Sequence, residues 1–154
     1  MLKKTMALLV CLMLVFSFAA CGQDTPAEVD LAAVKAKLYS DSPVTEPIEL
    51  SADRLTSLYG IAADSVVQNE SFLVMSDIFP AEIIMIKAVD TAAANDVAAK
   101  LQTRLDNLKV QSQSYDAESY AIAQACTVMQ DGVYVAMFFS EDGAAMETIY
   151  KSYF

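Results

Sequence analysis

A repeated succession of two β-rich segments and one helical segment constrains the fold of this chain more than any other feature. The β-rich segments carry β-branched and aromatic residues over six to eleven positions, whereas apolar residues recur every three or four positions in the helical ones. In order, the segments are residues 65–75, 82–89, 92–111, 125–130, 133–139 and 143–153. This order predicts an α+β fold, in which an antiparallel sheet of about four strands has the long helices packed across a face.

Three shorter helices complete the predicted architecture. Asp30 has the position of an N-cap for a helix over residues 31–38. Ser51 and Gly60 have the positions of the N-cap and the C′ residue of a second helix. Residues 115–123 predict a short helical turn between the two halves of the sheet. The order is therefore two N-terminal helices followed by ββα and ββα.

The dipeptide Asp131-Gly132 predicts a tight hairpin. Asp-Gly between two β-rich runs favours a type I′ turn, in which both central residues have positive φ. Such a loop pairs Gln130 with Val133, Val128 with Val135 and Cys126 with Met137. Both faces of this hairpin are rather apolar, so we expect it to be central in the sheet or covered on its second side.

The first 22 residues resemble a bacterial lipoprotein signal. Lys3 and Lys4 precede an apolar run of about 16 residues, which is shorter than the roughly 20 that a spanning helix needs. The run ends in Phe18-Ala19-Ala20-Cys21, a lipobox that departs from the usual Leu at its first position. The alternatives are a transmembrane anchor and an ordinary secretory signal, and Phe18 disfavours the second because a small residue is wanted there.

The lipoprotein interpretation sets the expected organisation and location. Residues 1–20 are the signal peptide, residues 21–29 the lipidated N-terminus and a short linker, and residues 30–154 a single α+β domain. Cys21 would carry the lipid and hold the domain at the extracytoplasmic face of the cell membrane. The chain has a formal net charge of −10, which disfavours nucleic acid and anionic lipid as partners, so the lipid is the expected membrane contact.

The third cysteine, Cys126, has no expected partner for a disulfide once Cys11 is removed with the signal and Cys21 is modified. It lies in an apolar run, where a free cysteine behaves as a small buried hydrophobic residue. We therefore expect a structural role for this thiol.

The residue types that are missing exclude much of enzyme chemistry. The chain has no histidine and no tryptophan, which removes Ser-His-Asp and Cys-His catalysis and imidazole zinc sites. It has only four glycines and no phosphate-binding glycine motif. Glu141-Asp142-Gly143 lacks the alternating ligands of a calcium loop and predicts a turn and helix start. We expect no enzyme activity, no cofactor and no metal, although carboxylate chemistry is not excluded by these absences.

Ile78 and Phe79 are the candidate partner contacts. They are large apolar residues in the connection between the first two predicted strands. Either this loop folds back over the core, or it exposes the two side chains as a contact site.

Several short segments occur together in an order that resembles a known family. They are a lipoprotein signal, Leu58-Tyr59-Gly60-Ile61, the run Ala81 to Lys87, Tyr115-x-x-Glu118 and Asp131-Gly132-Val133-Tyr134-Val135. Together these resemble the bacterial lipoproteins of domain-of-unknown-function family 4358, over roughly residues 30–154. The resemblance implies an exported lipoprotein of Gram-positive anaerobes and assigns no activity or functional residue.

Two hypotheses of function follow from these observations. The first is a non-catalytic binding or accessory domain of the cell envelope, with its site on an exposed sheet face or in the Met75–Pro80 connection. The alternative is a protein-inhibitor-like module that acts on a peptidase or wall enzyme through a hydrophobic loop. Either would take an envelope protein as partner.

Overall fold

A computed structural model describes residues 28–42, 44–76 and 79–154 of the chain. The predicted signal peptide, Cys21 and Ile78 lie outside these residues. No helix within the described ranges is long and apolar enough to cross a membrane.

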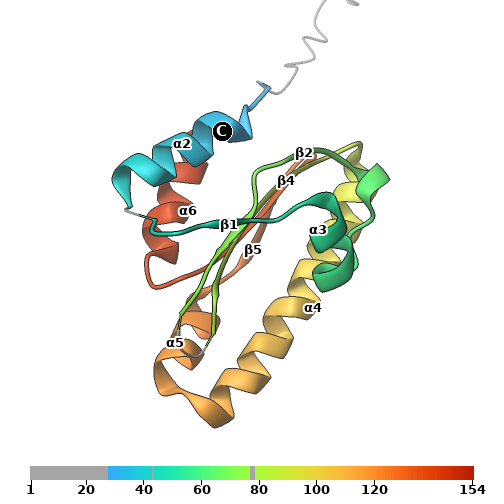
Figure 1. Ribbon diagram of the computed structural model, residues 1–154. Coiled ribbons are helices and arrows are strands. Elements are labelled where there is room, and N and C mark those ends of the chain that lie inside the picture. The colour runs from blue at the N-terminus through green and yellow to red at the C-terminus, as the bar shows by residue number, and fades with distance from the viewer. Residues whose placement is uncertain (1–27, 43, 77–78) are drawn as a thin grey trace, which may run out of the picture.

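An antiparallel sheet forms the centre of the molecule (Figure 1). Its neighbouring strands follow the order β1-β3-β4-β6-β5, and β2 also pairs with β4. The strands are β1 (Ile48–Glu49), β2 (Val66–Asn69), β3 (Phe72–Val74), β4 (Ala81–Ala88), β5 (Val128–Asp131) and β6 (Tyr134–Phe139). The α+β prediction is confirmed, and the short β1 is an edge strand that the sequence did not indicate.

Strands β2 and β3 are two parts of one run along β4. Asn69 lies opposite Ile86 and Phe72 lies opposite Ile83, so the register is the same on both sides of the interruption. The Glu70 amide donates to the Met85 carbonyl at 3.0 Å, which continues the ladder between the two parts. The predicted β-rich segment 65–75 is therefore one interrupted strand, with an irregularity between Val66 and Gln68.

Helices α2 to α5 begin at polar N-cap residues, because a short side chain with an acceptor oxygen can bond a free amide of the first turn. Asp30, Ser51, Asp90 and Asp116 each accept a hydrogen bond from a backbone amide of the first helical turn. The helices are α2 (Leu31–Asp41), α3 (Ala52–Tyr59), the 3₁₀ turn η2 (Ala63–Ser65), α4 (Thr91–Tyr115), α5 (Ala117–Ala125) and α6 (Gly143–Lys151). Gly60 closes α3 at φ +71°, a conformation that glycine adopts without strain.

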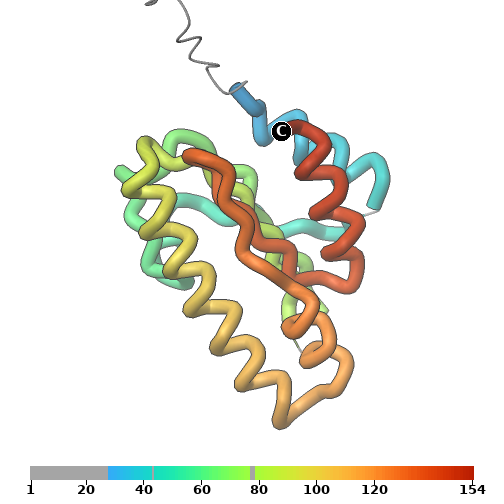
Figure 2. The backbone as a smooth tube through the Cα atoms, turned by 180° about the vertical axis from the view of Figure 1, so that it is seen from behind, coloured from blue at the N-terminus to red at the C-terminus, as the bar shows by residue number. Residues whose placement is uncertain are grey.

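Helices cover both faces of the sheet. Residues of α3, α4 and α5 form one buried cluster with Ile84 and Ile86, whereas residues of α2 and α6 form a second cluster with Ile83 and Met85. Figures 1 and 2 show α4 on one side of the sheet and α6 on the other. The expectation that the long helices share one face is wrong, because β4 and β6 are apolar on both faces and each face needs a cover.

The β5–β6 hairpin differs from the prediction in its register. Asp131 pairs with Tyr134 and Val128 with Met137, so the turn residues are Gly132 and Val133. Only Gly132 of these has positive φ, at +55°, which suits a type II′ turn and not the predicted I′ turn. The shift is two residues, the period of a strand, so the side chains that pair across the two strands stay on their predicted faces.

One buried ion pair lies under α4. Glu82 of β4 is 1% exposed, and its carboxylate accepts hydrogen bonds from Arg104 Nε at 3.1 and 3.2 Å and from Arg104 Nη2. The Tyr59 hydroxyl of α3 donates to the same carboxylate at 3.0 Å. Burial in the core and the adjacent Glu82 charge raise the pKa of Tyr59. This cluster joins α3, β4 and α4 through one carboxylate.

We expect Arg104→Met to lower the free energy of unfolding by about 3 kcal/mol, because it leaves the Glu82 carboxylate buried without its cation. The double variant Glu82→Leu/Arg104→Met should recover part of this loss, since it removes both charges. Chemical denaturation followed by circular dichroism measures both. The control is Lys100→Met, which breaks only a solvent-accessible pair with Asp96 and should change stability by less than about 0.5 kcal/mol. A single Arg104 variant as stable as this control would contradict the assignment.

Candidate functional site

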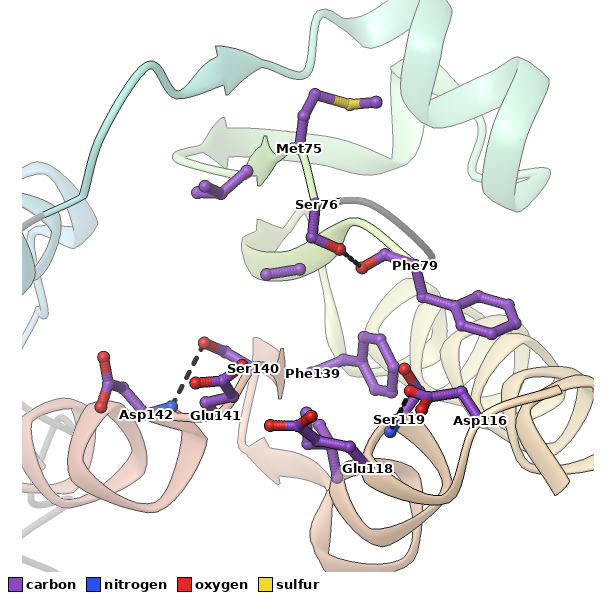
Figure 3. Close-up of a pocket in the computed structure, with 13 residues that line it drawn as sticks. Met75, Ser76, Phe79, Asp116, Glu118, Ser119, Phe139, Ser140, Glu141 and Asp142 are labelled. Atoms are coloured by element: carbon purple, nitrogen blue, oxygen red, sulfur yellow. Dashed lines mark hydrogen bonds between the residues drawn. The ribbon is translucent and has the colours of Figure 1, made fainter.

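A hollow of about 420 Å³ opens at the end of the sheet where β3 ends, β4 begins and β6 ends (Figure 3). The β3–β4 connection borders it through Met75, Ser76 and Phe79. The start of α5 and the segment between β6 and α6 form the opposite wall. The hollow therefore unites three chain segments that are far apart in the sequence.

Apolar side chains contribute much of the lining. Phe139 is buried in the cluster between the sheet and α4, and Phe79 and Ile122 are partly buried against the same cluster. Val74 and Ala81 come from the ends of β3 and β4. The Ser76 hydroxyl donates a hydrogen bond to the Phe79 carbonyl (Figure 3).

Carboxylates line the wall opposite the connection. They are Asp116, Glu118, Glu141 and Asp142, and the lining contains no lysine or arginine. Asp116 is occupied as the cap of α5, where hydrogen bonds from the Ser119 side chain and backbone hold the pKa of its carboxyl below the ordinary value. The carboxylates of Glu118, Glu141 and Asp142 take part in no hydrogen bond or ion pair with any residue that the structure describes.

The hollow has a net negative charge even after the helix dipoles are considered. The N-termini of α5 and α6 lie at its wall, and each contributes roughly half a positive charge. Four ionised carboxylates exceed this contribution by about three charges. The arrangement therefore favours a ligand with positive charge and an apolar group for the aromatic side chains.

A second hollow of about 260 Å³ adjoins the first and shares Ile122, Ser140 and Glu141 with it. Cys126 forms part of its lining but is itself only 8% exposed, as the sequence predicted for a structural thiol. Burial raises the pKa of the Cys126 thiol to about 11. A thiol that stays protonated near neutral pH is a poor nucleophile and a poor metal ligand.

Nothing in the described part of the chain brings three or more His, Cys, Asp or Glu side chains together as a metal site would require. A small hollow of about 150 Å³ also opens beside Glu82 and Arg104. Its two charged groups neutralise each other, so it has no net charge with which to select a ligand.

The residues that the sequence analysis singled out as functional differ in what the structure shows of them. Phe79 is half-buried against the core, as expected for a loop that folds back, and it also lines the large hollow. Its role as a partner contact stays a prediction. Ile78 and Cys21 lie outside the described residues. The expectation of an exposed sheet face is wrong for the part of the sheet described, because helices cover both faces.

Sequence reasoning missed the acidic wall. Glu141 and Asp142 were correctly interpreted as the turn before α6, and Asp116 and Glu118 as part of a helical stretch. No spacing signal could have brought them together with Phe79, since the sheet topology alone places these segments at one end.

The comparison with known families is decisive for the affiliation of the chain. The model of the family described as Domain of unknown function (DUF4358) matches residues 40–140. The chain belongs to this family. The match covers the sheet and helices α3 to α5, whereas α6 lies beyond it. No curated protein and no solved structure is significantly similar to the chain.

We expect Cys126 to react slowly with Ellman's reagent at pH 8 in the folded protein. The pKa of about 11 leaves little thiolate at that pH, and burial blocks access to the sulfur. The measurement uses a variant with serine at Cys11 and Cys21, and unfolding in guanidinium should restore the rate of an ordinary cysteine. Fast reaction of the folded variant would show that this thiol is open to solvent.

Proposed function

We propose that this protein is a non-catalytic binding or accessory domain of the cell envelope, held at the membrane by a lipid on Cys21. The observation that carries the proposal is the large hollow, with apolar side chains from the β3–β4 connection and unpaired carboxylates opposite. Concave sites of a few hundred Å³ that combine apolar walls with a few polar groups are typical of ligand binding. The ligand we propose is a cation with an apolar part, such as a basic segment of an envelope protein.

The geometry favours binding in a concavity over the inhibitor-like alternative. An inhibitor that blocks an enzyme with a hydrophobic loop needs a side chain that projects from the surface. Phe79 instead packs partly against the core and faces a hollow. The acidic wall also supplies a means of selecting a partner by charge, which a protruding apolar loop lacks.

Photo-crosslinking tests the hollow as the binding site. Met75 is 64% exposed at the rim, so a photoreactive amino acid in its place should form adducts with the ligand in native membranes. The control position is Val89, which is 50% exposed and lies just beyond the other end of β4, roughly 26 Å away along the strand. Mass spectrometry of the adducts identifies the ligand and compares the two positions.

The combined variant Glu118→Gln/Glu141→Gln removes two unpaired carboxylates, so it should weaken the Met75 adduct, and added salt should do the same. Equal adducts at Met75 and Val89 would contradict the proposed site. An adduct that is insensitive to both charge removal and salt would contradict the cationic ligand.

The proposed anchor predicts a second result. Cys21→Ala removes the sulfur that would carry the lipid, so the precursor should accumulate or the protein should appear in the medium, as after globomycin treatment. Cys126→Ala is the matched control and should remain with the membrane, because that thiol is buried in the fold. Cell fractionation and immunoblotting measure the distribution. Lipid anchoring would be contradicted if the mature protein with Cys21 intact were found free of the membrane.

A further inference from the structure

The outer edge of β5 is a second candidate interaction surface, and it shares no lining residue with the acidic hollow. β5 pairs with β6 on one side and is the terminal strand of the sheet. Figure 2 looks toward this edge and shows the β5–β6 hairpin between α4 and α6. An edge of this kind presents backbone groups that an added strand can pair with.

The hairpin geometry determines which backbone groups face outward. Asp131 and Tyr134 close a two-residue loop, so they exchange both hydrogen bonds, as do Met129 and Ala136 two residues on. The amide and carbonyl groups of Val128 and Gln130 therefore point away from β6. None of these backbone amide and carbonyl groups has a hydrogen-bond partner among the residues that the structure describes.

A helix forms a wall beside this edge. A hollow of about 240 Å³ lies between β5 and the C-terminal part of α6. Met129, Gln130 and Asp131 line it from the strand, and Tyr150, Lys151 and Phe154 line it from the other side. The Gln130 side chain donates a hydrogen bond from its Nε2 to Asn95 Oδ1 of α4 at 2.8 Å. Helix α4 therefore supports β5 from the other side, while the edge of the strand stays open.

Tyr150 gives an independent indication that this groove takes a ligand. Its side chain is 2% exposed, and its hydroxyl is the buried side-chain polar atom without a hydrogen-bond partner in the described structure. The ring packs against Phe138 and Phe154, with centroids 5.7 and 4.9 Å apart. A buried hydroxyl is normally paired, so its lack of a partner beside the hollow suggests that a bound group completes the site.

We propose that an extended peptide segment of a partner protein adds to the sheet along β5 and places a polar, uncharged side chain in the hollow beside Tyr150. The unpaired groups of Val128 and Gln130 repeat at the two-residue period of an extended chain, so they specify a strand as the occupant. Main-chain bonds to β5 supply affinity, and the hollow supplies selectivity for one side chain.

A second copy of this chain fits the edge less well than a peptide does. The edge lies between α4 and α6, and a second copy would bring its own two helices against them (Figure 2). Each copy also carries a formal net charge of −10, which opposes their association. A single extended segment meets neither obstacle.

Amide hydrogen exchange tests this proposal without altering the protein. In the free protein, the Val128 and Gln130 amides should exchange fast, whereas those of Met129 and Asp131 should be protected by pairing with β6. A peptide selected from a random phage-displayed library should protect the Val128 and Gln130 amides when it binds. Single N-methyl groups placed along the peptide should abolish binding at every second residue, where the peptide amide bonds to β5, and should be tolerated at the residues between.

Two pairs of variants separate the backbone and side-chain contributions. Gln130→Pro removes the outward amide, whereas Gln130→Ala loses the same side chain and keeps the amide, so Gln130→Pro should lower peptide affinity about tenfold or more relative to Gln130→Ala. Tyr150→Phe should weaken binding several-fold, whereas Tyr153→Phe, which alters a hydroxyl bonded to the Ala33 carbonyl outside the groove, should not.

Several results would overturn the proposal. The first is that the Val128 and Gln130 amides are already protected from exchange in the free protein, and the second is that no peptide can be selected. The third is a selected peptide that leaves these amides unprotected, or that binds the Gln130→Pro variant equally well. The fourth is a concentration-dependent dimer that Gln130→Pro dissociates. The last result would show that a second copy occupies the edge.

Discussion

The pairing of β4 with β6 is the interaction on which the rest of the structure depends. These two strands make the longest uninterrupted ladder of the sheet, over six paired positions, and nearly all of their residues are buried. Strands that are apolar on both faces are stable only when both faces are covered. The layer of α3, α4 and α5 and the layer of α2 and α6 are therefore two consequences of one constraint.

Double coverage also limits where the molecule can interact with others. With both faces occupied, the accessible parts of the sheet are its ends and its edges. The acidic hollow lies at one end, and the groove beside α6 lies along the β5 edge. Glu82 is the charged exception inside the sheet, and it is stabilised there by Arg104 and Tyr59 and is not available for binding. Both proposed surfaces therefore lie where the core leaves side chains or backbone groups unpaired.

Local signals predicted the elements well and their assembly less well. The caps at Asp30 and Ser51 and the apolar stripe of α4 followed directly from short-range chemistry and helical period. The hairpin was placed correctly, but its turn was displaced because Asp131 pairs with Tyr134 and does not enter the turn. Strand β1 was missed since two residues carry no periodic signal. The acidic wall was missed because its residues lie at helix starts that are distant in the chain from Phe79.

The sequence by itself determined the α+β class, the order of the elements and the faces of the paired hairpin residues, because these depend on periodicity and capping within short windows. It also indicated the lipoprotein signal, on which the proposed anchor rests, and the missing histidine that disfavours most enzyme chemistry. Only the tertiary structure decided that α4 and α6 lie on opposite faces, that four carboxylates line one hollow with Phe79, and that β5 is an open edge. These features arise from strand order and from which surfaces cover one another, and both depend on contacts between segments that are remote in the chain.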